Sequence, residues 1–335
     1  MVIDFVITWV DGNDPKWQKD KARYSPDTRS DTNNSRYRYW DNLQYWFRGV
    51  ENFAPWVNNI YFITYGHYPC WLNINHPKLK IIRHEDYIPR EWLPTFSSRT
   101  IDMNFHRIEQ LSEHFVYFND DMFLTAPVST RDFFRYGLPC DTAILNTLYV
   151  GIAPNRVEYM APIFDTIPIN RHFDKNRTIK GHLGKWFSPK YGLRSLRTLL
   201  LMPWKHFPGF LNYHLPYSYL KSTYTDLWNE EPELLSETCS HRFRETTDLN
   251  HWVFNYWQIA SGKFAPRSPR LGTQINLLGS YEPESTKKAV VAIRDRSTKI
   301  VCLNDGLPDQ DYQEVKDIVN SELLKLLPVK SQYEL

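Results

Sequence analysis

One short stretch, residues 115–123, most limits what this chain can fold into. It reads Phe-Val-Tyr-Phe-Asn-Asp-Asp-Met-Phe, so an aromatic and β-branched run typical of a central strand covered on both faces turns polar at Asn119, Asp120 and Asp121. In open α/β sheets, ligands bind at the carboxyl ends of strands. Two carboxylates placed there could hold a divalent cation and, through it, a phosphate. The same residues could also form a turn that caps a helix, so this stretch alone leaves both interpretations open.

The elements around this strand alternate in a way that predicts an α/β fold. Apolar runs bounded by turn residues indicate strands, and apolar residues three and four apart indicate helices. The expected order is strand 2–9, helix 41–53, strands 59–65 and 78–83, helix 99–113, strand 115–118, strand 298–303 and helix 309–327. We therefore expect one domain over residues 1–335, built on a mainly parallel, Rossmann-like sheet flanked by helices.

The segment 127–213 fits this alternation least well, and we expect a helical insertion there. It contains a predicted helix at 127–135, a predicted strand at 141–150, a basic cluster at 169–190 and an amphipathic pattern at 192–204. That amphipathic pattern suits a helix lying on a membrane or an acceptor lipid, and it suits a helix packed in the core equally well. The basic cluster fits a phosphate-rich substrate, a membrane surface or an ordinary solvated face.

Two further segments can be predicted, one as a helix and one without regular structure. A long helix should begin near Tyr213 and carry Tyr217, Leu220, Tyr224 and Trp228 on one face. Residues 18–39 are polar and lack long apolar runs, which indicates either a mobile loop over the ligand site or partial disorder.

Composition excludes several classes of protein. The 40 Lys and Arg against 38 Asp and Glu give a net charge of +2, so net charge alone predicts neither nucleic-acid binding nor strong membrane binding. The four cysteines lie at 70, 140, 239 and 302 without a CxxC pair, which argues against a zinc site and indicates reduced thiols in a cytoplasmic protein. We find no signal-peptide pattern and no apolar run long enough to span a membrane. Aromatic residues make up 16% of the chain, which favours stacking surfaces for sugars or bases.

Two other predicted strands end in polar turns. Strand 2–9 runs into a turn that contains Asp11 and Asp14, and strand 298–303 runs into Asn304, Asp305 and a glycine. A turn after the first strand of an α/β sheet commonly receives a nucleotide, although an ordinary turn has the same composition. Since two strand ends can lie side by side, Asp305 could share a metal site with the carboxylates at 120 and 121.

An ordered series of stretches carries a family resemblance. The series consists of residues 3–14, 39–43, 54–57, 93–98, 106–108 and 117–123, then His214-Leu215-Pro216 with Arg244, and finally 301–305. Together these stretches resemble the Stealth family of sugar-phosphate transferases, which includes bacterial capsular polysaccharide phosphotransferases and the catalytic subunit of the animal lysosomal-enzyme N-acetylglucosamine-1-phosphotransferase. The chain departs from that pattern at Tyr39-Trp40, where the family often has an arginine before Asp-Asn, and segment 127–213 has no counterpart.

The resemblance implies a GT-A-like form of the sheet and a single catalytic domain in which 127–213 is an insertion or acceptor-side subregion. It implies that a sugar-1-phosphate moves from a nucleotide sugar, expected to be a UDP-sugar, to a hydroxyl of an oligosaccharide or polysaccharide acceptor in capsular or cell-surface polysaccharide synthesis. A nucleoside monophosphate is released, and Mg²⁺ or Mn²⁺ neutralises the diphosphate. Whether the acceptor is carried on a lipid, and whether the cytoplasmic protein touches the inner face of the membrane, is left open.

The resemblance also suggests roles for individual residues. The expected metal ligands are Asp120, Asp121, Asn304 and Asp305. The expected catalytic residues are Asp14, His214, as the base that takes the acceptor's proton, and Arg244, as a clamp on the transferred phosphate. The expected donor-binding residues are Asp11, Asn42, Ser97, Ser98 and Arg107. Most of these residues have structural alternatives, such as helix capping for the serines and for Asn42, or a surface ion pair for Arg244.

Two other functions use the same features. A metal-dependent glycosyltransferase would also use an acidic pair at a strand end, but it would release a nucleoside diphosphate. A non-catalytic carbohydrate-binding protein would explain the aromatic content and would tolerate Asp120→Ala and His214→Ala.

Overall fold

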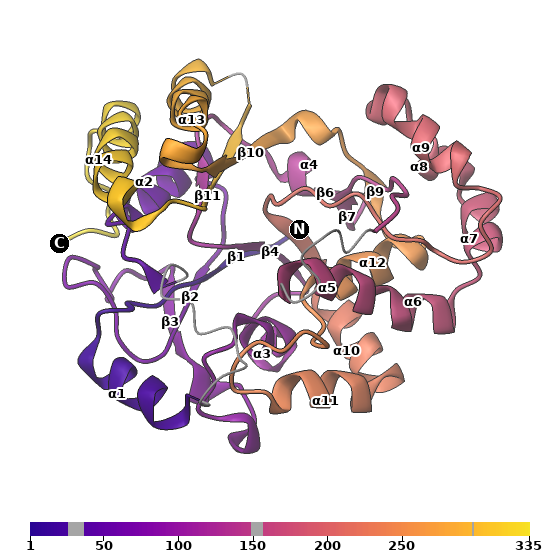
Figure 1. The fold of residues 1–335 in the computed structure, drawn as a ribbon, viewed down its shortest axis with the longest axis horizontal. Helices are drawn as coiled ribbons and strands as arrows, with labels where there is room; N and C mark the ends of the chain where they lie inside the picture. The colour runs from indigo at the N-terminus through magenta and orange to yellow at the C-terminus, as the bar shows by residue number, and fades with distance from the viewer. Residues whose placement is uncertain (26–36, 149–156, 297) are drawn as a thin grey trace.

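The computed structural model describes residues 1–25, 37–148, 157–296 and 298–335, and it is built around one five-stranded sheet (Figure 1). The strands in spatial order are β3 (Leu79–Arg83), β2 (Ile60–Thr64), β1 (Ile3–Thr8), β4 (His114–Phe118) and β8 (Tyr217–Leu220). The first four strands are parallel, and β8 runs antiparallel to β4 at the edge. The order 3-2-1-4 is that of one half of a Rossmann-type sheet, so the predicted α/β fold with a mainly parallel sheet is confirmed.

Both faces of this sheet are buried, as the unbroken apolar runs predict. Along β4, Val116 and Phe118 belong to one hydrophobic cluster, and Phe115 and Tyr117 belong to the other. The first cluster includes residues of α2 (Leu43–Phe53), α13 (Glu284–Asp295) and α14 (Asp309–Leu326). The second includes residues of α10 (Lys221–Glu230) and α12 (Trp252–Ala260). The central sheet is therefore the middle layer of the domain.

A smaller sheet begins where the central one ends. After β4 the chain turns through Asn119–Asp121 and enters β5 (Met122–Leu124), which pairs antiparallel with β11 (Ile300–Asp305); β11 pairs parallel with β10 (Gly272–Leu277). Cys302 lies opposite Met122 in this register, and the Leu303 amide donates to the Asp121 carbonyl oxygen at 2.9 Å. The acidic turn therefore lies at the junction of two sheets.

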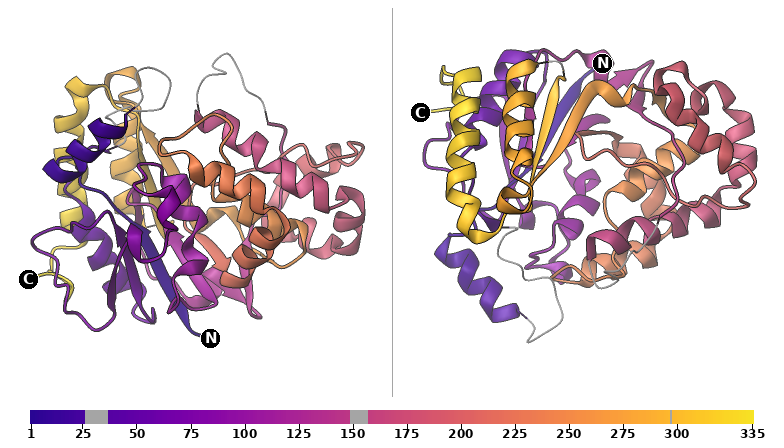
Figure 2. Two further views of the ribbon diagram at one scale, coloured as in Figure 1. Left: turned by 90° about the horizontal axis from the view of Figure 1, so that it is seen from below. Right: turned by 45° about the horizontal axis from the view of Figure 1, so that its top comes forward.

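The insertion is helical, as expected, but its elements differ from those predicted. Its helices are α5 (Val157–Phe164), α6 (Thr166–His172), α7 (Lys175–Gly181), α8 (Leu183–Trp186) and α9 (Ser195–Leu200). Figure 2 shows them projecting to one side of the central sheet. The helix expected at 127–135 shrinks to α4 (Thr130–Phe133) because β6 (Phe134–Arg135) and β7 (Leu138–Asp141) form a hairpin there, with β9 (Ala265–Pro266) beside β7. The strand expected at 141–150 is wrong over 142–148, and its last two residues lie outside the described part.

Three other expectations need correction. Residues 217–220 form β8 rather than the start of a helix, because their aromatic side chains complete the edge of the central sheet beside β4. The helix expected at 99–113 is only α3 (Ser98–Met103) followed by a 3-10 turn. Residues 18–24 are part of α1 (Pro15–Tyr24) instead of a loop, because Asp14 caps this helix and Trp17 anchors it. The rest of the predicted loop falls mostly outside the described residues.

The amino-terminal edge of the sheet and the C-terminal tail are held by buried polar groups. Asp4 is fully buried and accepts hydrogen bonds from Asn58 Nδ2, Asn59 N and Ser112 N at 2.8, 3.0 and 2.9 Å. At the tail, Glu334 forms a bidentate pair with Arg48 of α2.

The domain also contains α11 (Pro232–Ser240). No described helix is both long and apolar enough to cross a bilayer.

Candidate active site

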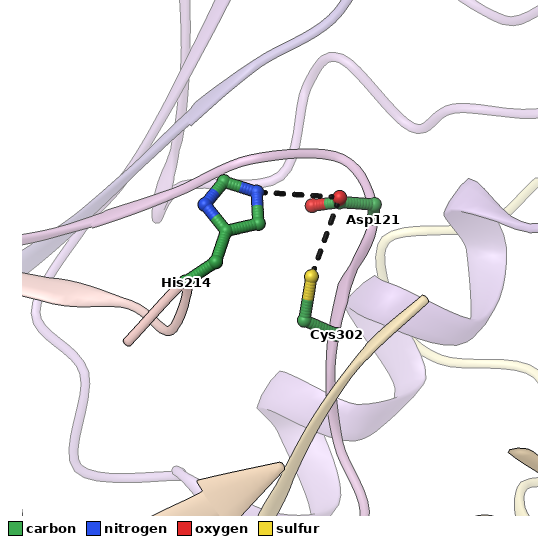
Figure 3. A group of neighbouring side chains, drawn as sticks. All are labelled: Asp121, His214 and Cys302. Carbon is green, nitrogen blue, oxygen red and sulfur yellow. Dashed lines mark hydrogen bonds and ion pairs between the residues drawn. The ribbon is translucent and has the colours of Figure 1, made fainter. Parts of the chain in front are cut away.

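Three side chains from distant parts of the chain meet at the acidic turn. Figure 3 shows His214, from the segment before β8, directed at Asp121, with Cys302 of β11 beside it. His214 Nε2 lies 3.5 Å from Asp121 Oδ2, and the Cys302 thiol donates to the same oxygen at 3.3 Å. His214 Nε2 also lies 3.3 Å from Asn119 Nδ2. The residues predicted as a metal ligand and as a base are therefore in direct contact.

The charges of this group reinforce one another. Burial alone would raise the pKa of Asp121, but the charge and hydrogen bond of His214 and the Cys302 thiol outweigh it, so this pKa is lowered. Burial alone would lower the pKa of His214, and the Asp121 carboxylate outweighs that effect and raises it. Burial and the Asp121 charge both raise the pKa of the Cys302 thiol. The thiol therefore stays protonated near neutral pH, and the hydrogen bond that it donates holds the Asp121 carboxylate in position.

The acidic turn offers a carboxylate oxygen for a ligand. Asp121 Oδ1 is buried and has no hydrogen-bond partner among the described residues. The Asp120 side chain is exposed at the surface, but protein atoms near it displace part of its water. This desolvation and the Asp121 charge raise the pKa of Asp120. An unpaired buried carboxylate oxygen beside a second, exposed carboxylate is a donor set that a hard divalent cation fits. Asp121, His214 and Cys302 also form a group of metal-ligating types within 4.8 Å, although a protonated thiol is a poor ligand.

A buried polar network lies behind this site. Tyr117 on β4 donates to Asp102 Oδ1 at 2.9 Å, and its hydroxyl lies 3.2 Å from Thr8 Oγ1. Burial raises the pKa of Asp102 to about 8, against the Tyr117 hydrogen bond and the charge of Arg244. Burial lowers the pKa of His251, and the charges of His214 and Arg244 both add to that effect. Arg244 and His214 therefore act on one electrostatic environment.

Arg244 and the two serines lie at the start of α3. The Arg244 guanidinium donates to Ser98 Oγ at 2.6 Å. Ser97 is the N-cap residue of α3, and within the described part of the chain its buried hydroxyl makes neither a capping bond nor any other hydrogen bond. A guanidinium and hydroxyls at a helix start can bind phosphate oxygens. These contacts are compatible with the roles predicted for Ser97, Ser98 and Arg244, which stay predictions.

A cavity of about 340 Å³ lies at the carboxyl ends of β1, β2 and β3, and its lining includes Asp14, Tyr65, His67 and His84. His67 Nε2 accepts from the Asp11 amide at 2.8 Å, and its Nδ1 lies 3.7 Å from Asp14 Oδ1. Burial lowers the pKa of His67, against the charges of Asp14 and Asp11, so the ring stays neutral and Nδ1–H faces Asp14. Asp14 Oδ1 also accepts from Trp17 N at 2.7 Å and so caps α1, and the catalytic role of Asp14 stays a prediction.

The end of β11, with Asn304 and Asp305, lies only partly beside the acidic turn that follows β4. Because Cys302 is the residue opposite Met122, Asn304 and Asp305 extend beyond the turn. Asp305 Oδ2 accepts from Trp40 Nε1 at 3.2 Å, and Oδ1 accepts from the Leu307 amide at 2.9 Å. Asn304 Nδ2 donates to Asn276 at 3.0 Å. Both side chains are thus engaged by protein groups, and their roles as metal ligands stay predictions.

The remaining predicted donor-binding residues have local structural contacts. Asn42 is the buried residue at the start of α2, and among the described residues its side chain makes no capping bond there. Arg107 packs over the Trp228 ring at 4.9 Å and donates to Asn104 at 2.9 Å. Their contact with a nucleotide stays a prediction.

Sequence reasoning missed several residues of this region. His67 follows directly after the predicted strand at 59–65, so the strand-end rule that singled out Asp11 could have found it. Cys302 was assigned to a strand, but only the antiparallel register with β5 places its thiol at Asp121. Asp102 and His251 carry no local signal, because only tertiary packing makes them neighbours of the site.

The chain matches models of a known protein family. Three regions of the Stealth protein match: conserved region 1 at residues 1–29, conserved region 2 at 36–139 and conserved region 4 at 291–335. His214 and Arg244 lie outside these three ranges, so their assignment to a further family region stays a prediction.

Relatives match over nearly the whole chain. The capsular polysaccharide phosphotransferase WcwK of Streptococcus pneumoniae is 41% identical, over 99% of this chain and 98% of its own. The receptor polysaccharide phosphotransferase WefC of Streptococcus oralis is 43% identical, over 99% of both. The exopolysaccharide phosphotransferase cps2G of Lactiplantibacillus plantarum is 35% identical, over 99% and 96%.

Among solved structures, the galactosyltransferase LgtC in complex with donor and acceptor sugar analogues is 8% identical, over 98% of both chains, with a TM-score of 0.43. That score is too low to support an argument. The family regions and the full-length relatives do support one, and the chain belongs to the Stealth family, with polysaccharide phosphotransferases as its relatives.

Proposed function

We propose that the chain transfers a sugar-1-phosphate from a nucleotide sugar to a hydroxyl of a glycan acceptor. The acceptor oxygen bonds to the phosphorus that carries the sugar, the bond joining the two phosphates breaks, and a nucleoside monophosphate leaves. The observation that carries this proposal is the contact of His214 with Asp121 at the carboxyl end of β4, in a relative of polysaccharide phosphotransferases. Phosphoryl transfer depends mainly on positioning and charge stabilisation, which this arrangement can supply.

The nucleotide half of the donor is assigned to the cavity beside Asp14 and His67. This cavity lies over the carboxyl ends of three parallel strands, where nucleotides bind in sheets of this order. Tyr65 and His67 line it and offer flat rings for a base. The diphosphate would then lie toward the acidic turn, within reach of the Ser98–Arg244 pair.

Asp120 and Asp121 are assigned to a divalent cation, Mg²⁺ or Mn²⁺, because Asp121 Oδ1 is buried and unpaired. When bound, this cation would neutralise the charge of the diphosphate. The other oxygen, Asp121 Oδ2, faces His214 and stabilises its charged form. His214 can therefore take the proton of the acceptor hydroxyl while Asp121 stabilises the imidazolium that forms.

The decisive experiment identifies the nucleotide released. The purified protein is incubated with Mg²⁺ or Mn²⁺, a panel of nucleotide sugars and an oligosaccharide acceptor, and products are read by mass spectrometry. A nucleoside monophosphate supports the proposal, and a nucleoside diphosphate would make the protein a glycosyltransferase. Sugar binding that survives Asp120→Ala and His214→Ala without turnover would make it a carbohydrate-binding protein.

The role of His214 is tested by His214→Ala, with the exposed His206→Ala as the matched control. As a base, His214 contributes roughly 10²–10⁴-fold to kcat. We expect that loss with an unchanged cation concentration for half-maximal activity. If the required cation concentration rises instead, His214 is a metal ligand.

The acceptor is a glycan, and we propose that it is carried on a lipid, so that the enzyme works at a membrane surface. The basic insertion next to His214 supports this assignment, and its chemistry is developed below.

A further inference from the structure

Helix α9 has its polarity inverted relative to an ordinary surface helix. Its one fully buried side chain is Thr198, whose hydroxyl accepts from the Leu145 amide at 3.1 Å. Leu196 and Leu200 lie four residues apart on the opposite side and are 53% and 74% exposed. The apolar residues at 192–204 therefore divide into two groups. Leu201 and Met202 are partly buried and pack against the core, whereas the leucines of α9 point to solvent.

These leucines are part of a larger surface that we call the leucine patch. Its members are Leu193 (85% exposed), Leu196, Leu199 (56%), Leu200 and Trp204 (54%). Figure 1 shows α7, α8 and α9 together at the edge of the molecule opposite α14. Soluble proteins rarely expose large apolar side chains in such a group, and a group of this kind marks an interaction surface.

The charge around the leucine patch selects the partner. Residues 175–208 contain 8 Lys and Arg and no Asp or Glu, so this segment carries +8 while the rest of the chain carries −6. Only Lys175 among these cations is buried, where it donates to the carbonyl oxygens of Leu201 and Met202. The segment therefore combines exposed cations with exposed leucines and a tryptophan, which is the composition of a segment that lies in the interface of an anionic bilayer.

The leucine patch adjoins the candidate active site. The Arg194 guanidinium lies 5.6 Å from the centre of the Tyr213 ring, and Tyr213 directly precedes His214. Arg197, one turn farther along, donates to Asn146 at 2.6 Å. A surface seated on this patch would therefore lie beside the segment that positions His214.

We propose that the leucine patch and its surrounding cations dock this protein on an anionic lipid bilayer. The leucines and Trp204 enter the interface, and the exposed cations pair with lipid phosphates. This inference rests on the proposed function for its purpose, because an acceptor glycan on a lipid would then be presented next to His214. The docking itself requires neither donor nor acceptor.

The test is vesicle sedimentation of the full chain without substrates. Vesicles of phosphatidylcholine alone are compared with vesicles that also contain phosphatidylglycerol, at low and high salt. We expect binding to the anionic vesicles that weakens with salt. The variant Leu193→Ser/Leu196→Ser/Leu200→Ser should bind roughly a hundredfold more weakly. The matched control Val291→Ser/Leu324→Ser/Val329→Ser removes three exposed apolar residues on the opposite edge and should bind as the wild type does.

Three results would overturn the docking proposal. The first is a wild type that does not sediment with anionic vesicles, and the second is a leucine variant that binds like the wild type. The third is a wild-type dimer in light scattering that becomes monomeric in the leucine variant, which would make the patch an interface between copies of this chain. Nucleotide release with a soluble acceptor should be unchanged in the leucine variant, so failure of docking and failure of the proposed reaction are distinguishable.

Discussion

Replacing Glu334 by glutamine should show how much of the stability depends on one buried pair. Glu334 accepts two hydrogen bonds from Arg48, at 2.8 and 2.7 Å, and both side chains are less than 10% exposed. Arg48 also donates to the Leu327 carbonyl oxygen, and Glu334 accepts from the Ser331 amide. The pair thus joins α2 to the end of α14 and to the last residues of the chain.

Removing one member of a buried ion pair costs about 3–5 kcal/mol, because the remaining charge is left uncompensated. Glutamine keeps the shape and one hydrogen bond to Arg48, so we expect the free energy of unfolding to fall by about 2–4 kcal/mol. For a domain of this size, the melting midpoint should fall by roughly 3–6 °C. In Arg48→Met/Glu334→Gln no unpaired charge remains, and the combined loss should be smaller than the sum of the single losses by about 1–3 kcal/mol.

The same variant makes a pH prediction. Burial alone would raise the pKa of Glu334, but the hydrogen bond from Arg48 outweighs it, so the pKa is lowered in the folded state. A lowered pKa contributes stability above the ordinary glutamate value of about 4.3, and that contribution is lost as the pH falls through the folded-state value. The difference in unfolding free energy between wild type and Glu334→Gln should therefore be constant near neutral pH and shrink in acid.

Chemical denaturation followed by circular dichroism measures these quantities. The control is Glu282→Gln, which breaks the exposed pair with Lys288 and should change stability by less than about 0.5 kcal/mol. If Glu334→Gln is as mild as this control, or if the double variant is additive, the tail is not held by this pair.

Two further predictions concern the site. His67→Phe removes the ring nitrogen that accepts from the Asp11 amide in the donor-side cavity; we expect the KM for the nucleotide sugar to rise roughly tenfold with kcat nearly unchanged, and an unchanged KM would move the nucleotide elsewhere. Tyr117→Phe removes a buried hydroxyl that donates to Asp102 and contacts Thr8; we expect a loss of about 1–3 kcal/mol in unfolding free energy, and a neutral effect would show that this network contributes no stability.

Local pattern was sufficient to predict the four parallel strands of the central sheet and the acidic residues that follow β4. Strands 2–9, 59–65, 78–83 and 115–118 are all present, because each is a short apolar run between turn residues. Asp120 and Asp121 could be singled out for the same reason, since the polarity changes abruptly after Phe118.

The errors arose where tertiary contacts outweigh local pattern. Tyr217 and Leu220 share a helical spacing with Tyr224 and Trp228, yet pairing with β4 makes residues 217–220 a strand. The place of Cys302 depends on a register between β5 and β11, two strands almost 180 residues apart in the chain. For α9, the sequence shows that one face is apolar but cannot show that this face is the exposed one.

The amino and carboxyl ends of the parallel strands in the central sheet differ in how completely the nearby buried polar atoms are hydrogen-bonded. At the amino ends, both oxygens of Asp4 accept hydrogen bonds, whereas at the carboxyl ends Ser97 Oγ and Asp121 Oδ1 have no partner in the part of the chain that the structure describes. An enzyme selected only for resistance to heat would gain most by filling or removing those unpaired atoms. Directed evolution for thermostability is therefore expected to enrich substitutions near the carboxyl ends of the strands, and these should lower turnover. A screen that also selects for activity should find its stabilising substitutions near the amino ends.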